Sequence, residues 1–163
     1  NRDIILTQQE NVLLPAIRHA IKLKIRIVKA DEREEISGPS SRKLLNFGHT
    51  IGHAIESKCE FKNFNHGEAV ALGMAVEATI SQNLGLLSKE HLETVLTALH
   101  QYQFKLTFPR DWLPNIIELM KRDKKNRGPK ISMALISHIG KAVVVNDIPL
   151  NIVRTSLTEF AGA

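Results

Sequence analysis

The chain of 163 residues contains one cysteine, Cys59, and only 5% aromatic residues. A single cysteine excludes an internal disulfide framework and suits a reducing compartment, so we expect a cytoplasmic location. No stretch approaches the ~20 apolar residues that a membrane helix needs, so we expect no membrane partner. The N-terminus lacks the charged-then-apolar layout of a signal peptide. These absences argue against a disulfide-stapled secreted domain and against a membrane span.

A Gly-rich strand–turn–helix signature for a dinucleotide is absent as well, so we expect no NAD-binding residue in this chain. The hydrophobic content of 43% and the charged content of 24% are ordinary for a globular protein. A chain of this length can bury a real core. We therefore expect residues 1–163 to form one domain.

The formal net charge is +5, which suggests an anionic partner. The densest basic cluster spans residues 121–130, but no aromatic residue alternates with its charges as a stacking platform for bases would require. We therefore expect no nucleic-acid partner. A phosphate clamp fits better, because Lys24 and Arg42 supply further cations. A solvated charged face is the simpler alternative.

The most informative segment runs from Arg42 to Glu56. On a helix, positions 42, 46, 49, 53 and 56 would share one face, and that face carries Arg, Asn, His, His and Glu. The aliphatic and aromatic residues of the segment lie on another stripe: Leu44, Phe47, Ile51, Ala54 and Ile55. The pattern predicts a helix with one packing face and one face made to hold a polar ligand.

Two glycines, Gly48 and Gly52, lie four residues apart in this segment. Each interior glycine costs about 1 kcal/mol relative to alanine, and close approach of another backbone or of a ligand is the usual reason for it. His49 and His53 are also four residues apart, and such a pair can converge on one metal ion. The simpler alternative is a helix–helix contact through small residues, with histidines that are merely hydrogen-bonded.

Zinc-peptidase chemistry is disfavoured, because Thr50 follows the first histidine where that pattern requires glutamate. His66 offers a third imidazole, and it precedes Gly67, Glu68 and a long apolar run. This order predicts that His66 stands at the entrance of a helix, where it can reach a metal held by the preceding helix. An exposed turn residue is the alternative.

Near the N-terminus, Thr7–Glu10 is a candidate capping box for a helix that Pro15 would kink or restart. That helix is expected to bury one stripe of aliphatic residues: Leu14, Ile17, Ile21 and Ile25.

Further helices are predicted from about residue 68 to 84, after Ser88, around 111–121 and from about 151. Residues 131–136 and 142–145 are predicted to be the strands of a hairpin with its turn at 138–141. The predicted fold class is mainly α, multi-helical, with one small β-hairpin near residues 131–145.

Two segments, Leu44–Glu56 and His66–Met74, closely resemble 3-dehydroquinate synthases. The resemblance extends upstream to Leu23-Lys24 and Asp31–Glu34, and downstream to Arg122–Lys125. It therefore touches nearly the whole chain. One departure is residues 35–41, where the family usually has a short Gly-containing link, and this insert could move Glu34 relative to Arg42.

The resemblance implies the metal- and substrate-binding C-terminal domain of a lyase of the shikimate pathway, which serves aromatic amino acid biosynthesis. The reaction converts 3-deoxy-D-arabino-heptulosonate 7-phosphate to 3-dehydroquinate and phosphate, with NAD and zinc or cobalt. The family's NAD-binding domain and its third metal ligand, a glutamate, precede the segment that begins here. With the missing initiator methionine, this predicts a fragment that is inactive alone and that belongs to a homodimer when full length.

The resemblance also implies roles for individual residues. His49 and His66 match the metal ligands, His53 matches the proton-handling histidine, and Glu34 matches an acidic residue in proton transfer. The predicted substrate contacts are Lys24, Arg42, Asn46, Lys124 and Lys125, with Lys124 favoured over Lys125 on the phosphate.

Alternatives remain open in the same superfamily. A sedoheptulose-phosphate cyclase or a metal-dependent polyol dehydrogenase would use a similar helical domain. Asn46, His53 and Lys124-Lys125 favour dehydroquinate synthase, since the cyclases tend to vary at such positions. A non-enzymatic metal-binding module is the structural alternative.

Overall fold

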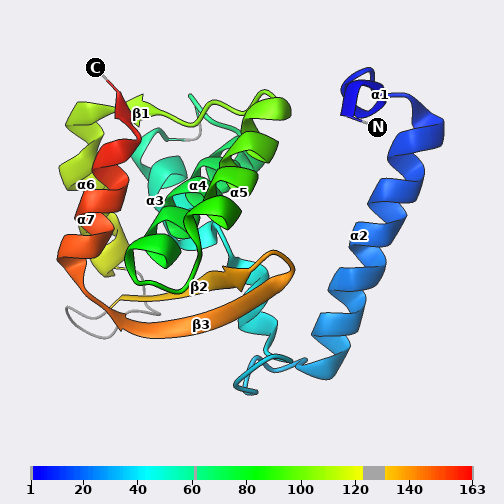
Figure 1. Cartoon of the computed structure of the whole chain (residues 1–163), viewed down its shortest axis with the longest axis horizontal. Helices are drawn as coiled ribbons and strands as arrows, with labels where there is room; N and C mark the ends of the chain where they lie inside the picture. The colour runs from blue at the N-terminus through cyan, green and yellow to red at the C-terminus, as the bar shows by residue number, and fades with distance from the viewer. Residues whose placement is uncertain (1, 61, 123–130, 163) are drawn as a thin grey trace. The chain divides into compact units, whose positions relative to one another are not determined.

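The computed structural model describes residues 2–60, 62–122 and 131–162 (Figure 1). Contacts between residues divide the chain into two compact units, residues 1–45 and 46–163. The predicted fold class is confirmed, because the described residues are mainly helical and the sheets are small. The expectation of a single domain stays a prediction. No helix among the described residues is both long enough and apolar enough to cross a membrane.

The first unit contains a short helix, α1 (Arg2–Leu6), and a long one, α2 (Glu10–Ala30). The predicted capping box is wrong, because the residue that caps α2 is Gln9 and its side chain makes no capping hydrogen bond. Thr7 instead donates its hydroxyl hydrogen to the carbonyl oxygen of Ile4 at 2.8 Å. Pro15 does not restart the helix, which continues unbroken through it.

The prediction that α2 buries its aliphatic stripe is also wrong. The four residues are exposed by 41%, 50%, 51% and 47%, in the order Leu14, Ile17, Ile21 and Ile25. The physical reason is that the described residues of the first unit, 2–45, include no second helix of comparable length, since α1 has five residues. Amphipathic spacing predicts which face of a helix is apolar, but a partner element is needed to cover it.

The second unit is built around α4 (His66–Asn83), with α3 (His49–Lys58) and α5 (Lys89–Gln101) packed against it. α4 also contacts α7 (Leu150–Glu159) and the strand β2 (Ile131–His138). Figure 1 shows α4 in the interior of this unit. Most of its residues from 69 to 81 are buried, so this part of α4 is covered by other elements around nearly its whole circumference.

The remaining elements surround this core. α6 (Leu113–Arg122) follows a short 3-10 helix, η2 (Arg110–Trp112). The predicted hairpin is confirmed: β2 pairs antiparallel with β3 (Lys141–Ile148). Two short strands, β1 (Phe108–Pro109) and β4 (Ala161–Gly162), pair in parallel.

The segment from Arg42 to Glu56 is not one helix, so the predicted shared face of five polar residues is wrong. Arg42–Asn46 form a 3-10 helix, η1, and α3 begins only at His49. Between them Gly48 has φ of 84°, a left-handed conformation that interrupts the helical path. Only positions 49, 53 and 56 therefore share a face of α3.

The prediction that glycines mark a close approach is confirmed, and the neighbour is the backbone of α4. A Cβ added to Gly52 would lie 3.1 Å from the carbonyl oxygen of Ala69. A Cβ on Gly73 would lie 2.0 Å from the carbonyl oxygen of Gly48, a separation that real side chains do not reach. The backbones of α3 and α4 therefore approach each other closely near the histidines that both helices carry.

Candidate metal centre

Three imidazoles meet where α3 and α4 begin. The ring centroids of His49 and His53 are 5.4 Å apart, those of His49 and His66 are also 5.4 Å apart, and those of His53 and His66 are 6.0 Å apart. The structure therefore brings together all three histidines that the sequence pattern singled out. His53 and His66 are exposed, whereas His49 is half-buried.

A capping box places His66 at the first residue of α4, as its position before the apolar run predicted. The side chain of Asn65 accepts a hydrogen bond from the backbone N–H of Glu68 at 3.0 Å. The carboxylate of Glu68 accepts in return from the backbone N–H of Asn65 at 2.8 Å. Two N–H groups that the helix leaves unpaired are thereby satisfied, and the backbone beneath His66 is held.

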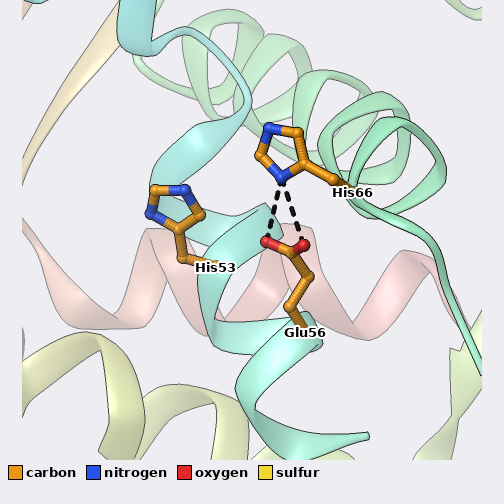
Figure 2. Close-up of side chains that lie close together, drawn as sticks. All are labelled: His53, Glu56 and His66. Carbon is orange, nitrogen blue, oxygen red and sulfur yellow. Dashed lines mark hydrogen bonds and ion pairs between the residues drawn. The ribbon is translucent and has the colours of Figure 1, made fainter. Parts of the chain in front are cut away.

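Each of two histidines turns its Nδ1 atom toward an oxygen. The Nδ1 of His49 lies 3.3 Å from the carbonyl oxygen of Phe47. The Nδ1 of His66 lies 3.1 and 3.2 Å from the two carboxylate oxygens of Glu56 (Figure 2). If each Nδ1 carries the proton, the lone pair of each neutral ring is on Nε2, which would be the atom that binds a metal ion.

The donor set suits a divalent transition metal. One ligand atom each from His53, Glu56 and His66 can be chosen so that all three lie within 4.8 Å of one another. Imidazole nitrogen with carboxylate oxygen is a ligand combination typical of zinc and also suited to cobalt. The residues present therefore fit such an ion, although the roles of individual histidines stay predictions.

Glu77 of α4 is a buried carboxyl group that the sequence reasoning missed. It is fully buried, and its oxygens accept hydrogen bonds from the backbone N–H groups of Gly48 at 2.5 Å and Ile51 at 3.2 Å. Burial raises the pKa of Glu77 to about 8, against the lowering effect of the N–H donors of Gly48, Ile51 and Thr50. Glu77 thus accepts hydrogen bonds from two of the N-terminal N–H groups of α3 that the helix itself cannot pair.

Signals for the two missed glutamates differ in strength. Glu56 lies one helical turn after His53, on the polar face that the sequence predicted. The sequence therefore indicated that Glu56 lies close to the histidines, but it assigned no role to this residue. Glu77 is a lone acidic residue within an otherwise apolar run. An isolated acidic residue in an apolar helix indicates that its side chain is paired with a polar group in the interior. Because that polar group belongs to another helix, the sequence does not identify it.

In the first unit, Asp31 closes the loop that contains the insert at residues 35–41. Its carboxylate accepts hydrogen bonds from the backbone N–H groups of Glu35 at 2.9 Å, Ile36 at 3.1 Å and Arg42 at 2.8 Å. Burial acts to raise the pKa of Asp31, but these three donors, together with the charge of Lys43, lower it below its ordinary value. The insert is therefore tied at both ends to one side chain.

Two predicted site residues lie in this loop. Glu34 has a left-handed φ of 61° and donates its backbone N–H to the carbonyl oxygen of Asp31 at 3.3 Å. Arg42 donates from its guanidinium to the carbonyl oxygen of Glu32 at 3.0 Å. The two residues are thus held in one closed loop of the first unit, and their catalytic and substrate-binding roles stay predictions.

The other predicted substrate contacts are spread over the chain. Lys24 lies on α2 and is exposed, and Asn46 is half-buried at the end of η1, within the second unit. Lys124 and Lys125 lie outside the described residues.

Comparison with known proteins identifies relatives of this chain. The family described as 3-dehydroquinate synthase C-terminal matches residues 1–126. A 3-dehydroquinate synthase from Dictyoglomus turgidum is 39% identical over 148 residues, which cover 91% of this chain and 40% of that protein. One from Nitrosospira multiformis is 34% identical over 157 residues, covering 96% and 42%. The chain spans about two fifths of the length of these curated relatives.

Solved structures share the fold as well, among them two synthases. A 2-epi-5-epi-valiolone synthase from Streptomyces hygroscopicus, with NAD+ and Zn2+ bound, has a TM-score of 0.72 and 21% identity, covering 93% of this chain and 41% of that one. A 2-deoxy-scyllo-inosose synthase in complex with carbaglucose-6-phosphate, NAD+ and Co2+ has a TM-score of 0.61 and 24% identity, covering 71% and 33%. At these identities the likeness concerns the fold alone.

Proposed function

Because the chain belongs to the 3-dehydroquinate synthase C-terminal family, we propose that it is the metal- and substrate-binding part of a 3-dehydroquinate synthase. The complete enzyme would convert 3-deoxy-D-arabino-heptulosonate 7-phosphate to 3-dehydroquinate and phosphate. The observation that carries this proposal is the convergence of His49, His53 and His66 at the junction of α3 and α4. NAD would be bound mainly by a domain that precedes this segment in the family.

In this proposal His49 and His66 hold a zinc or cobalt ion through their Nε2 atoms. The support is that Phe47 and Glu56 place an oxygen at the Nδ1 of each ring. When bound, the metal would act as a Lewis acid on the C5 oxygen of the sugar, and NAD would accept and return a hydride at that carbon. The third ligand would be the glutamate that precedes this segment in the family.

His53 is the proposed proton-transfer residue. It lies one turn after His49 on α3, within 6.0 Å of the His66 ring centroid, and it is exposed to solvent. Imidazole is the side chain used most often as a general acid or base in enzymes, so it can accept and return a proton during turnover. In this assignment His53 is beside the metal without ligating it, and Glu34 assists proton transfer.

Cations and one amide would hold the substrate. Lysine and arginine side chains suit a phosphate and a carboxylate, and the net charge of +5 favours approach of such an anion. The proposed contacts are Lys24, Arg42, Asn46, Lys124 and Lys125. The complete protein would act as a cytoplasmic homodimer.

A sugar-phosphate cyclase of the same superfamily is the second candidate, since such an enzyme would use a similar helical domain. The 2-deoxy-scyllo-inosose synthase and the 2-epi-5-epi-valiolone synthase share the fold of this chain. The curated relatives at 34% to 39% identity are named 3-dehydroquinate synthases, which favours the first candidate. A metal-dependent polyol dehydrogenase or a non-enzymatic metal-binding module has less support.

Phosphate release tests the proposal. The complete protein, with NAD and Zn2+, is expected to release phosphate from 3-deoxy-D-arabino-heptulosonate 7-phosphate, and the chain of residues 1–163 alone is expected to release none. Sedoheptulose 7-phosphate, the substrate expected for a cyclase, is tested in parallel for comparison. Turnover of that sugar alone would assign the protein to the cyclases, and phosphate release by the 163-residue chain alone would overturn the division of roles.

A further inference from the structure

The contact between Glu56 and His66 joins a buried group to an exposed one. The side chain of Glu56 is 7% exposed, whereas that of His66 is 60% exposed. Both carboxylate oxygens lie at nearly equal distances from one ring nitrogen, 3.1 and 3.2 Å from Nδ1. In Figure 2 the Nδ1 edge of the His66 ring faces Glu56, and the opposite edge points away from it.

This arrangement favours one of the two ring nitrogens of His66, Nδ1, as the one that carries the proton. A carboxylate accepts hydrogen bonds, so it favours the form of the ring in which Nδ1 is the donor. The lone pair of the neutral ring is then on Nε2, at the edge that points away from Glu56. In many metal sites, a hydrogen-bond acceptor at the ring nitrogen that does not bind the metal fixes the orientation and the tautomer of the histidine.

We propose that Glu56 is a positioning residue, which orients His66 so that its Nε2 faces the metal and which does not itself bind the ion. This inference rests on the proposed function for the identity of the ion. His49 also has an oxygen atom close to its Nδ1, since the carbonyl oxygen of Phe47 lies 3.3 Å from that nitrogen. A proton on Nδ1 of each ring would leave the lone pair of both rings on Nε2.

The competing arrangement uses Glu56 as a ligand. One oxygen of Glu56 lies within 4.8 Å of ligand atoms of His53 and His66, so an ion could bind the carboxylate and the Nδ1 of His66 together. That arrangement requires the proton between Glu56 and Nδ1 to leave. Whether the Nδ1 of His66 carries a proton in the zinc-loaded protein therefore distinguishes Glu56 as a positioning residue from Glu56 as a metal ligand.

The experiment compares Glu56→Gln, Glu56→Ala and wild type, with Glu60→Ala as the matched control. Glu60 is an exposed glutamate four residues further on, paired with Lys62 at 2.9 Å. Long-range 1H–15N correlation spectra of the His66 ring, assigned with His66→Gln, report the tautomer with and without Zn2+. Competition titration reports the affinity for Zn2+ and Co2+, and circular dichroism shows that each variant is folded.

Without metal, wild type, Glu56→Gln and Glu60→Ala are expected to protonate His66 at Nδ1, since the glutamine carbonyl can still accept. Glu56→Ala is expected to shift the ring toward the other tautomer. With Zn2+, the wild-type Nδ1 is expected to stay protonated. Metal affinity is expected to fall about 10- to 100-fold in Glu56→Ala and less in Glu56→Gln.

Three outcomes would overturn the inference: an unchanged tautomer in Glu56→Ala, a deprotonated Nδ1 in the zinc-loaded wild type, or equal affinity losses in Glu56→Ala and Glu60→Ala. Failure of the proposed function has a different signature. If His49→Gln and His66→Gln bind Zn2+ as tightly as wild type, the metal site is misassigned, and the metal-free spectra still decide whether Glu56 orients His66.

Discussion

The side-chain carboxyl group of Glu77 accepts a hydrogen bond from the backbone N–H of Gly48 at 2.5 Å, across 29 residues of sequence. It also accepts from Ile51 at 3.2 Å, so one side chain of α4 holds the start of α3. His49 lies between these two donors in the sequence. The start of the histidine-bearing helix therefore depends on a residue that is remote in the chain.

Glu77→Ala is expected to lower the free energy of unfolding by about 1–3 kcal/mol for each N–H group left without a partner. The measurement is urea denaturation near neutral pH, without metal. Glu90→Ala is the control, because Glu90 is exposed on α5, and it should change stability by less than about 1 kcal/mol. Equal losses in the two variants would contradict the capping role.

The contribution of Glu77 to stability is expected to depend on pH. Its pKa is about 8 in the folded protein and 4.5 for the ordinary group, so the folded state holds a proton that the unfolded state releases. Stability from this group is complete below about pH 4.5 and falls as the pH rises toward 8. The total loss is on the order of 5 kcal/mol, because the pKa values differ by about 3.5 units and each unit corresponds to about 1.4 kcal/mol.

The measurement is the free energy of unfolding across this pH range for wild type and for Glu77→Gln, which cannot titrate. The difference between the two should change with pH in favour of the glutamine variant as the pH rises. Parallel curves would show that the carboxyl group does not hold its proton in the folded state.

Gly73→Ala is expected to destabilise the protein by about 3 kcal/mol, because the added methyl group would lie 2.0 Å from the carbonyl oxygen of Gly48. The matched control is Gly67→Ala, also on α4, where the added Cβ would meet only the side-chain oxygen of Asn65 at 3.5 Å. The control should change stability by less than about 1 kcal/mol. Chemical denaturation of both variants measures the difference, and a Gly73→Ala variant as stable as the control would refute the close approach of α3 and α4.

Removal of metal is expected to leave the fold intact. The core of the second unit is formed by fully buried aliphatic residues such as Ile51, Ile55 and Leu72, whereas His53 and His66 are exposed. Burial of this core stabilises the unit without help from an ion. Helical circular dichroism before and after addition of a chelator is the measurement, and a large loss of signal would show that metal is structural.

In the complete enzyme, His53→Ala is expected to lower kcat about 100- to 10,000-fold with little change in KM, because it removes a proton-transfer group. Lys124→Ala is expected chiefly to raise KM, since a cation on the phosphate acts in both the ground state and the transition state. Steady-state phosphate release at varied substrate concentration measures both. Wild-type kcat in His53→Ala would show that the role of His53 is wrongly assigned.

The sequence by itself determined the elements whose signals are local. The hairpin at residues 131–148 follows from β-branched and aliphatic runs on either side of a turn, and the start of α4 at His66 follows from a polar residue before an apolar run. Family membership was visible in the same way, because the segments around His49 and His66 are long and specific. Patterns of this kind depend on residues that are close together in the sequence, so they can be recognised without knowledge of the fold.

Only the tertiary structure decided how these elements meet. Helical spacing extended the motif helix back to Arg42, but Gly48 adopts a left-handed conformation beside α4 and α3 begins at His49. The stripe of α2 that includes Ile17 has the right spacing for burial, yet no element among the described residues of the first unit covers it. The contact of Glu56 with His66 and the cap that Glu77 places on α3 arise from packing of α3 against α4, and the energy of such contacts depends on distances between residues that no local pattern records.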